Sequence, residues 1–170
     1  MDVPEGHART AGLRSATPGD AEAVAAIYLA AGVRAWSAFL TAEVLASEGT
    51  VGRWLQRIAT LQEARGEVMV LACDAGGPVG FAWIVPARGE LEALYTHPDV
   101  WGGGYGRLLL GVAEDHLRRH GCRSATLWTE ARNTRARGVY ERAGWLPDGG
   151  VRERVYAGTQ LRELRHRKAL

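Results

Sequence analysis

The sequence contains a single lysine, Lys168, close to its C-terminus. Nucleotide-binding P-loops end in Gly-Lys-Ser or Gly-Lys-Thr, because the lysine and the hydroxyl bind the phosphates and the magnesium ion. Lys168 follows an arginine and precedes Ala169, so it belongs to no such motif. The lack of lysine therefore excludes the P-loop class of nucleotide-binding proteins.

Cysteine is also scarce, with Cys73 and Cys122 the only two. They form no CxxC motif and no cluster with histidine, so the sequence offers neither a disulfide framework nor a recognisable metal site. The first residues lack the apolar run of a secretory signal peptide. We therefore expect two reduced thiols, no bound metal and a cytoplasmic location.

Long apolar runs and a strong net charge are absent as well. The net charge is +2, and 46% of the residues are hydrophobic and 24% charged, which is typical of a soluble globular protein. A chain of 170 residues is long enough to bury one hydrophobic core without the support of disulfide bonds or a structural metal. We expect residues 1–12 to form a flexible tail ahead of a single domain over 13–168, with no membrane span.

Arginine is nevertheless concentrated in two late segments, 132–142 and 162–168. Binding to nucleic acid requires a concentrated basic face, and a net charge of +2 does not by itself indicate one. We interpret the two segments as solvated helix and terminal charge. Nucleic-acid binding through them is the less favoured alternative, which salt-sensitive binding to random DNA would support.

The most informative stretch covers residues 90–122 and is typical of a strand, a glycine turn and a helix. Four glycines within 102–106 leave the backbone without Cβ atoms, so consecutive N–H groups can approach one anion. The helix is predicted to begin near Gly104 and to end before Gly121, with its positive dipole end at the turn. This pattern predicts a bound diphosphate, although the glycine spacing fits a dinucleotide fold poorly.

Around this unit we expect an α/β (α+β) fold. Strands are predicted at 13–16, 67–73, 78–85, 90–96 and 123–129, helices from Ala21, after Thr41 and over 51–65, and a final hairpin within 152–167. Turn residues at 74–77 predict antiparallel pairing. The succession of strand, helix and strand over 90–129 predicts one parallel pair. The sheet should therefore be mixed and mostly antiparallel, with helices flanking it.

Two motifs resemble the GCN5-related N-acetyltransferase (GNAT) family. Gly104-x-Gly106, after a strand that ends at Thr96, resembles the acetyl-CoA motif (Q/R)-x-x-G-x-(G/A), with Trp101 in the Gln/Arg place. N-x-x-A-x-x-V-Y-E-R-x-G-W, beginning at Asn133, resembles a second family motif with Trp for its closing Phe. The resemblance covers nearly the whole chain and identifies 13–168 as an N-acetyltransferase domain with splayed parallel strands at the coenzyme site.

The resemblance implies acetyl-CoA as co-substrate and an acyltransferase activity. The residues expected to bind the coenzyme are Leu94, Tyr95 and Thr96 on the strand, Gly102, Gly103, Gly104, Tyr105, Gly106 and Arg107 at the turn, and Asn133 further on. Asn133 could equally cap the helix that it begins. The acetyl group is expected to pass to a primary amine by direct attack in a ternary complex.

Three residues are candidates for catalysis. An alkylamine has a pKa near about 10.4, so a base must remove a proton before the nitrogen attacks. Glu90 and Glu92 share one strand face and are candidates for this base, with Glu90 slightly favoured because it occupies the place of a catalytic glutamate in the family. Tyr140 matches the family tyrosine and is the candidate acid. Both glutamates could instead belong to a polar sheet face, and Tyr140 to the core.

The acceptor stays open at this stage, because both a small-molecule amine and a protein amine suit the scaffold. Trp36, Phe39 and Trp54 are candidates to shape the acceptor cleft or are ordinary core aromatics. An acyl-CoA-binding sensor or regulatory module without turnover is the alternative function. The final strands could also pair between two copies, so a homodimer is compatible with the sequence.

Overall fold

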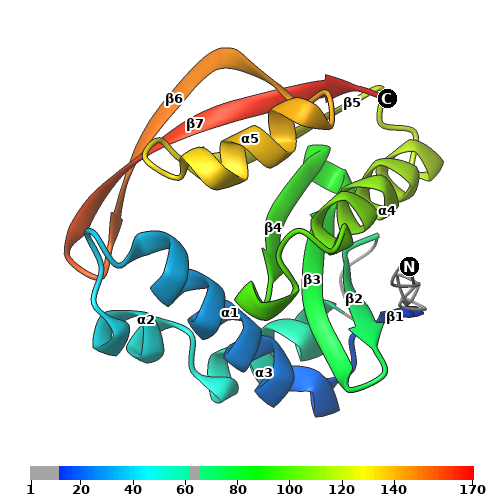
Figure 1. Cartoon of the computed structure of the whole chain (residues 1–170). Helices are drawn as coiled ribbons and strands as arrows, with labels where there is room; N and C mark the ends of the chain where they lie inside the picture. The colour runs from blue at the N-terminus through cyan, green and yellow to red at the C-terminus, as the bar shows by residue number, and fades with distance from the viewer. Residues whose placement is uncertain (1–11, 62–65) are drawn as a thin grey trace, which may run out of the picture.

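The computed structural model describes residues 12–61 and 66–170. The tail predicted over 1–12 lies outside the described residues except for Gly12, and so does the end of the helix predicted over 51–65. Within the described ranges, seven strands form one sheet in the order β1-β2-β3-β4-β5-β7-β6 (Figure 1). None of the described helices is long and apolar enough to cross a membrane.

The elements follow the predicted order. The strands are β1 (Gly12–Ser15), β2 (Val68–Asp74), β3 (Gly77–Val85), β4 (Glu90–Thr96), β5 (Ser124–Glu130), β6 (Leu146–Tyr156) and β7 (Thr159–Ala169). The α-helices are α1 (Ala21–Trp36), α2 (Ala42–Glu48), α3 (Val51–Leu61), α4 (Tyr105–Arg119) and α5 (Thr134–Arg142). The final hairpin is longer than predicted, because β6 continues to pair with β7 beyond a register shift between Pro147 and Val151.

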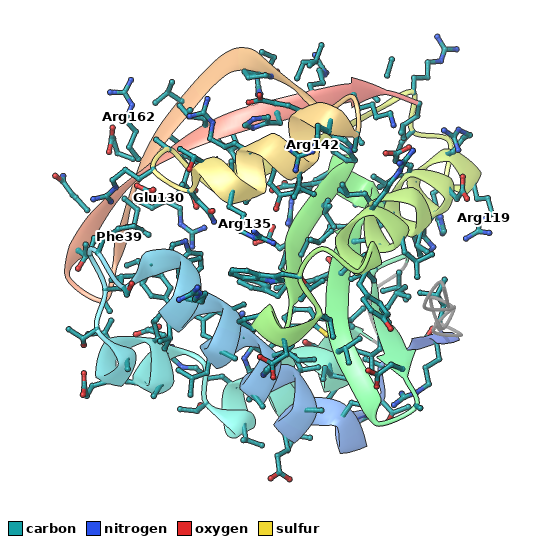
Figure 2. All side chains as sticks on the ribbon, viewed as in Figure 1. Phe39, Arg119, Glu130, Arg135, Arg142 and Arg162 are labelled. Atoms are coloured by element: carbon teal, nitrogen blue, oxygen red, sulfur yellow. The ribbon has the colours of Figure 1, made fainter. Side chains whose placement is uncertain are left out.

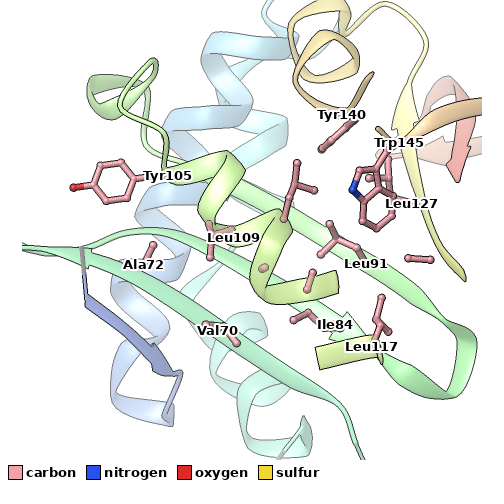
Figure 3. Close-up of a cluster of buried hydrophobic side chains, with 14 of the residues drawn as sticks. Val70, Ala72, Ile84, Leu91, Tyr105, Leu109, Leu117, Leu127, Tyr140 and Trp145 are labelled. Carbon is pink, nitrogen blue, oxygen red and sulfur yellow. The ribbon is translucent and has the colours of Figure 1, made fainter. Parts of the chain in front are cut away.

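The two faces of the sheet bury different helices. Along β2, alternate side chains face opposite sides, as in any strand: Val70 packs in one buried cluster and Leu71 in another. The first cluster includes the apolar face of α4 and reaches Tyr140 and Trp145 (Figure 3). The second contains the inward faces of α1, α2 and α3. The sheet therefore lies between two helical layers.

All strand pairs are antiparallel except β4 with β5, which confirms the predicted mixed sheet. Within the described residues, β4 and β5 share one register pair, Glu90 with Thr126, before they separate. In Figure 1, β4 runs downward from α5, whereas β7, the neighbour of β5, runs along the top of the view. The predicted splayed parallel strands are thus confirmed.

A β-bulge in β4 was not predicted from the sequence. Ile84 of β3 pairs with Leu91 and Trp83 pairs with Ala93, which leaves Glu92 as the extra residue. Such an insertion bends a strand and shifts its alternation by one position. As a result, Leu94 packs in the same cluster as Leu91, whereas Ala93 packs on the opposite face. The bulge therefore places Glu92 where the strand turns away from β5.

Candidate active site

A cavity of about 840 Å³ opens where β4 and β5 separate. Its walls include residues of α1, α3, β4, β5, α5 and β6. In Figure 1, α1 lies below this space and α5 lies above it. Eleven of the predicted site residues line it: Glu92, Leu94, Tyr95, Thr96, Gly102, Gly104, Tyr105, Gly106, Arg107, Asn133 and Tyr140. Residues far apart in the sequence thus share one space.

One end of the cavity is the glycine turn before α4. Gly104 is the N-cap residue, with a φ of 86°, a left-handed conformation that glycine adopts without strain. Leu108 N–H donates to the Gly104 carbonyl over 3.0 Å. The N–H groups of the first helical residues, Tyr105 to Arg107, have no intrahelical acceptor, as at any helix start. They form, with the helix dipole, a site for an anion.

Gly103 differs from its neighbours. It is not among the residues that line the cavity, and its N–H donates to the Val100 carbonyl over 3.0 Å. A Cβ atom on Gly102 or Gly104 would meet no protein atom within 4 Å, whereas one on Gly103 would lie 3.0 Å from the Val100 oxygen. Gly103 therefore shapes the turn, and its neighbours border the open space.

Trp101 and Arg135 stand beside this turn. The Trp101 indole Nε1 donates to the Thr96 carbonyl over 3.0 Å, and the Arg135 guanidinium lies 4.1 Å from the centre of the Trp101 ring. Figure 2 shows Arg135 extending from α5. The sequence offered only the arginine-rich segment 132–142 as a signal. Arg135 and Arg142 are exposed, in keeping with solvated charge, and both also line the cavity.

Asn133 both caps a helix and borders the cavity. Its side-chain oxygen accepts a hydrogen bond from Ala136 N–H over 3.2 Å, so it caps α5. The residue also lines the cavity. Capping uses the oxygen, and the side-chain amide group stays available as a donor.

The two candidate bases differ in position. Arg88 binds both, with its Nε 3.0 Å from Glu90 and a terminal nitrogen 2.5 Å from Glu92. Glu92 lines the cavity, whereas Glu90 is not among the lining residues. Burial raises the pKa of Glu92, and the neighbouring charge of Glu90 raises it further. The position of Glu92 in the cavity wall therefore favours Glu92 over Glu90 as the candidate base.

Tyr140 is a buried residue of α5 whose side chain reaches the cavity. Burial raises the pKa of its hydroxyl to about 12. Its ring packs edge-on against His166 of β7, with 5.9 Å between the ring centres. The hydroxyl consequently keeps its proton at neutral pH, and the ring is held by packing (Figure 3).

The other end of the cavity is aromatic. The lining residues there are Tyr28, Trp36, Trp54, Trp83, Tyr95 and Tyr156. The Tyr28 hydroxyl is hydrogen-bonded to that of Tyr156, which joins α1 to β6. Two of the three aromatics predicted to shape this region, Trp36 and Trp54, line it. Phe39 does not, and instead packs under the Arg132 guanidinium at 3.8 Å.

Metal-binding residues do not converge at this site. In the part of the chain that the structure describes, no group of three or more histidines, cysteines, aspartates and glutamates could hold a metal ion. Cys73 and Cys122 are both free thiols.

Comparison with known proteins places this geometry in context. Residues 33–145 match the model of the acetyltransferase (GNAT) family. A mycothiol acetyltransferase of Propionibacterium freudenreichii is 38% identical over 84 residues, which are 46% of this chain and 27% of that protein. A probable N-acetyltransferase of Mycobacterium tuberculosis is 28% identical over 143 residues, 81% of this chain and 80% of that protein. The chain thus spans well under half of the first relative's length.

Solved structures share the fold. A GCN5-related N-acetyltransferase from Rhodopseudomonas palustris superposes with a TM-score of 0.80 at 23% identity, over 97% of this chain and 100% of that one. An acetyltransferase from Salmonella typhimurium, solved with acetyl-CoA, has a TM-score of 0.72 at 20% identity, over 95% of this chain and 94% of that one. These likenesses confirm the predicted fold class.

Proposed function

Because the chain belongs to the acetyltransferase (GNAT) family, we propose that it transfers an acetyl group from acetyl-CoA to a primary amine by direct attack in a ternary complex. The family match confirms the resemblance seen in the motifs. The observation that carries the proposal is the cavity itself, which combines a helix start, a half-buried carboxylate and a buried tyrosine hydroxyl. These are an anion site, a base and an acid.

Binding of the coenzyme follows from the open backbone groups. Its diphosphate would lie against the N–H groups of Tyr105 to Arg107, where the helix dipole favours negative charge. Its pantetheine arm would run along Leu94 to Thr96, because the separation of β4 from β5 leaves that strand edge facing the cavity. The Asn133 amide group would donate to the arm from the side of α5.

Glu92 would accept the proton of the attacking amine, directly or through one water. A base works best when its pKa lies near the working pH, and burial moves the pKa of Glu92 in that direction. Arg88 holds the carboxylate in place. The attack then produces an oxyanion, which an N–H group of β4 would stabilise by on the order of 3 kcal/mol.

Tyr140 would complete the reaction as the acid. Its raised pKa keeps the hydroxyl protonated at neutral pH, so that it donates a hydrogen bond to the sulfur as negative charge develops there. The proton passes to the sulfur as the carbon–sulfur bond breaks. The nitrogen loses two protons in all: Glu92 takes the first before the attack and passes it to solvent, and the second leaves the tetrahedral intermediate and restores the proton that Tyr140 gives to the sulfur. No acyl-enzyme forms.

Calorimetry and a thiol-release screen test the proposal. Calorimetry should detect acetyl-CoA binding, and incubation with a panel of small amines, amino acids and protein N-termini should release CoA and yield an acceptor heavier by one acetyl group. Binding without CoA release from any amine would instead indicate a sensor or regulatory module. An absence of binding would contradict both functions.

A further inference from the structure

We propose that the acceptor is a small amino acid with an apolar side chain, and that Arg57 binds its carboxylate. This inference rests on the proposed function and specifies the substrate class of the same site. It assigns to Arg57 a role in specificity, separate from coenzyme binding and from proton transfer.

Arg57 is held at the aromatic end of the cavity. It belongs to α3 and lines the cavity, and its guanidinium lies 5.0 Å from the centre of the Trp54 ring and 5.5 Å from that of Trp83. Trp54 is only 2% exposed, so this contact surface is fixed by the core. Stacking on aromatic faces leaves the N–H edge of a guanidinium free for a carboxylate, which it binds in two parallel hydrogen bonds.

The charges around the cavity leave Arg57 uncompensated. Each glutamate that lines the cavity is paired with an arginine: Glu48 with Arg53, Glu92 with Arg88, Glu130 with Arg132 and Glu163 with Arg152. Among the described residues, no carboxylate lies within 4.0 Å of the Arg57 guanidinium. The acceptor end thus attracts an anionic group and disfavours a second ammonium group.

The position of Arg57 suits a substrate that also reaches the base. Trp83, under the guanidinium, pairs with Ala93 of β4, the residue next to Glu92. Arg57 lines the cavity together with Tyr95 and Tyr156. A molecule that spans from Arg57 to Glu92 would therefore carry its carboxylate at one end and its amine at the other.

The surroundings between these groups favour an apolar side chain. The rings of Tyr28, Trp36 and Tyr95 meet one another there at centroid distances of 5.3 to 6.5 Å. Burying an apolar side chain against such rings removes apolar surface from water and so favours binding. A polyamine or a sugar amine would bury polar groups against the same surface.

Matched substrate pairs test the inference. Leucine, methionine, phenylalanine and a longer apolar amino carboxylate are each compared with the corresponding carboxamide, which keeps the amine and the side chain and removes the negative charge. Spermidine serves as a cationic acceptor. With the wild-type chain and acetyl-CoA, kcat/KM should be at least about tenfold higher for the acids than for their amides.

Variants of Arg57 separate charge recognition from folding. Arg57→Met should raise the KM for the amino acid at least about tenfold and leave both the KM for the amide and the acetyl-CoA affinity unchanged. Arg57→Lys should restore part of the loss. The control is Arg34→Met, because Arg34 is exposed on α1 and is not among the residues that line the cavity.

Four outcomes would overturn the inference while leaving the proposed function intact. They are equal or better transfer to the amides, better transfer to spermidine, an equal loss for acid and amide in Arg57→Met, and transfer to protein amines with no turnover of any amino acid. In contrast, an absence of transfer to every class of amine would overturn the proposed function and this inference with it. Retained acetyl-CoA affinity confirms that each variant is folded.

Discussion

The Arg135 guanidinium lies 4.1 Å from the centre of the Trp101 ring. The indole in turn donates to the Thr96 carbonyl, so this one stack joins the start of α5, the glycine turn and the end of β4. Such a cation is held in place by the ring and keeps its N–H groups for another partner. It stands at the end of the cavity proposed for the coenzyme diphosphate.

Replacing Arg135 should therefore weaken coenzyme binding. Arg135→Met removes one charge-assisted contact, worth about 1.4 kcal/mol, and should raise the acetyl-CoA Kd about tenfold in calorimetry. The loss should shrink as salt is added, because salt screens the wild-type attraction. Arg119→Met, at the far end of α4 (Figure 2), is the control and should leave the Kd unchanged. Equal affinities for wild type and Arg135→Met would exclude this role.

Gly104 is required by its backbone conformation. Gly104→Ala would place a Cβ on a residue with a φ of 86°, at a cost of about 1–2 kcal/mol, although no protein atom obstructs it. We expect that loss in urea unfolding, together with a raised acetyl-CoA Kd. Gly111→Ala, inside the same helix and also in open space, should instead stabilise the fold by up to about 1 kcal/mol. Similar effects of the two changes would contradict the strain argument.

The pH dependence of kcat/KM should distinguish the role of Glu92 from that of Glu90. Because the pKa of Glu92 is raised, its base form is lost as pH falls through that raised pKa, and kcat/KM should fall with it. Glu92→Gln should reduce turnover by about 100-fold and abolish this acid limb. Glu90→Gln should keep most of the activity and move the limb to lower pH, because the Glu90 charge helps to raise the pKa of Glu92. The reverse pattern would make Glu90 the base.

Tyr140 should affect turnover more than binding. Tyr140→Phe keeps the ring that packs on His166 and removes only the hydroxyl. We expect kcat to fall by about 100-fold, within the range for a lost general acid, while the acetyl-CoA Kd changes less than twofold. Steady-state kinetics and calorimetry measure the two quantities separately. An unchanged kcat would remove Tyr140 from the mechanism.

Asp20 links the first strand to α1 and gives a pH-dependent stability. Hydrogen bonds from Arg14 and Thr17 hold the pKa of its carboxyl well below its usual range, despite its burial. A lowered pKa contributes stability above the unfolded-state value of about 3.9, and this stability is lost as pH falls further. Asp20→Asn should cost about 1–3 kcal/mol at pH 7 in urea unfolding. The difference from wild type should narrow below about pH 4.

Local chemistry explains what the sequence could predict. The glycine turn, the caps at Gly104 and Asn133 and the end of α4 at Gly121 depend on neighbouring residues only, and the structure has them where the patterns place them. The bulge at Glu92 depends on pairing with a strand elsewhere in the chain, so alternation along β4 alone gave no sign of it. The sequence therefore could not show that Glu92, the residue at the bulge, lines the cavity and that Glu90 does not.

Long-range packing explains what the sequence could not predict. Arg57 and Arg135 reach the cavity because helices distant in sequence bring them over Trp83 and Trp101. The neighbours of Arg135 in the sequence do not distinguish it from a solvated arginine. Arg57 follows Trp54 by three positions on α3, but its second contact, with Trp83, is not visible in the sequence. The same applies to Phe39, whose contact with Arg132 across the chain removes it from the acceptor end.

In the described residues, the single register pair between Glu90 and Thr126 leaves most of β4 without a partner strand on the side of β5. Beyond it, the backbone of β4 is an unfinished edge in the middle of the protein, and under the proposed function the thioester substrate supplies the missing neighbour. The free edge of β4 would then be covered each time acetyl-CoA binds and exposed again each time CoA leaves. For part of every catalytic cycle, the bound thioester would therefore act as a structural element of the sheet as well as a substrate.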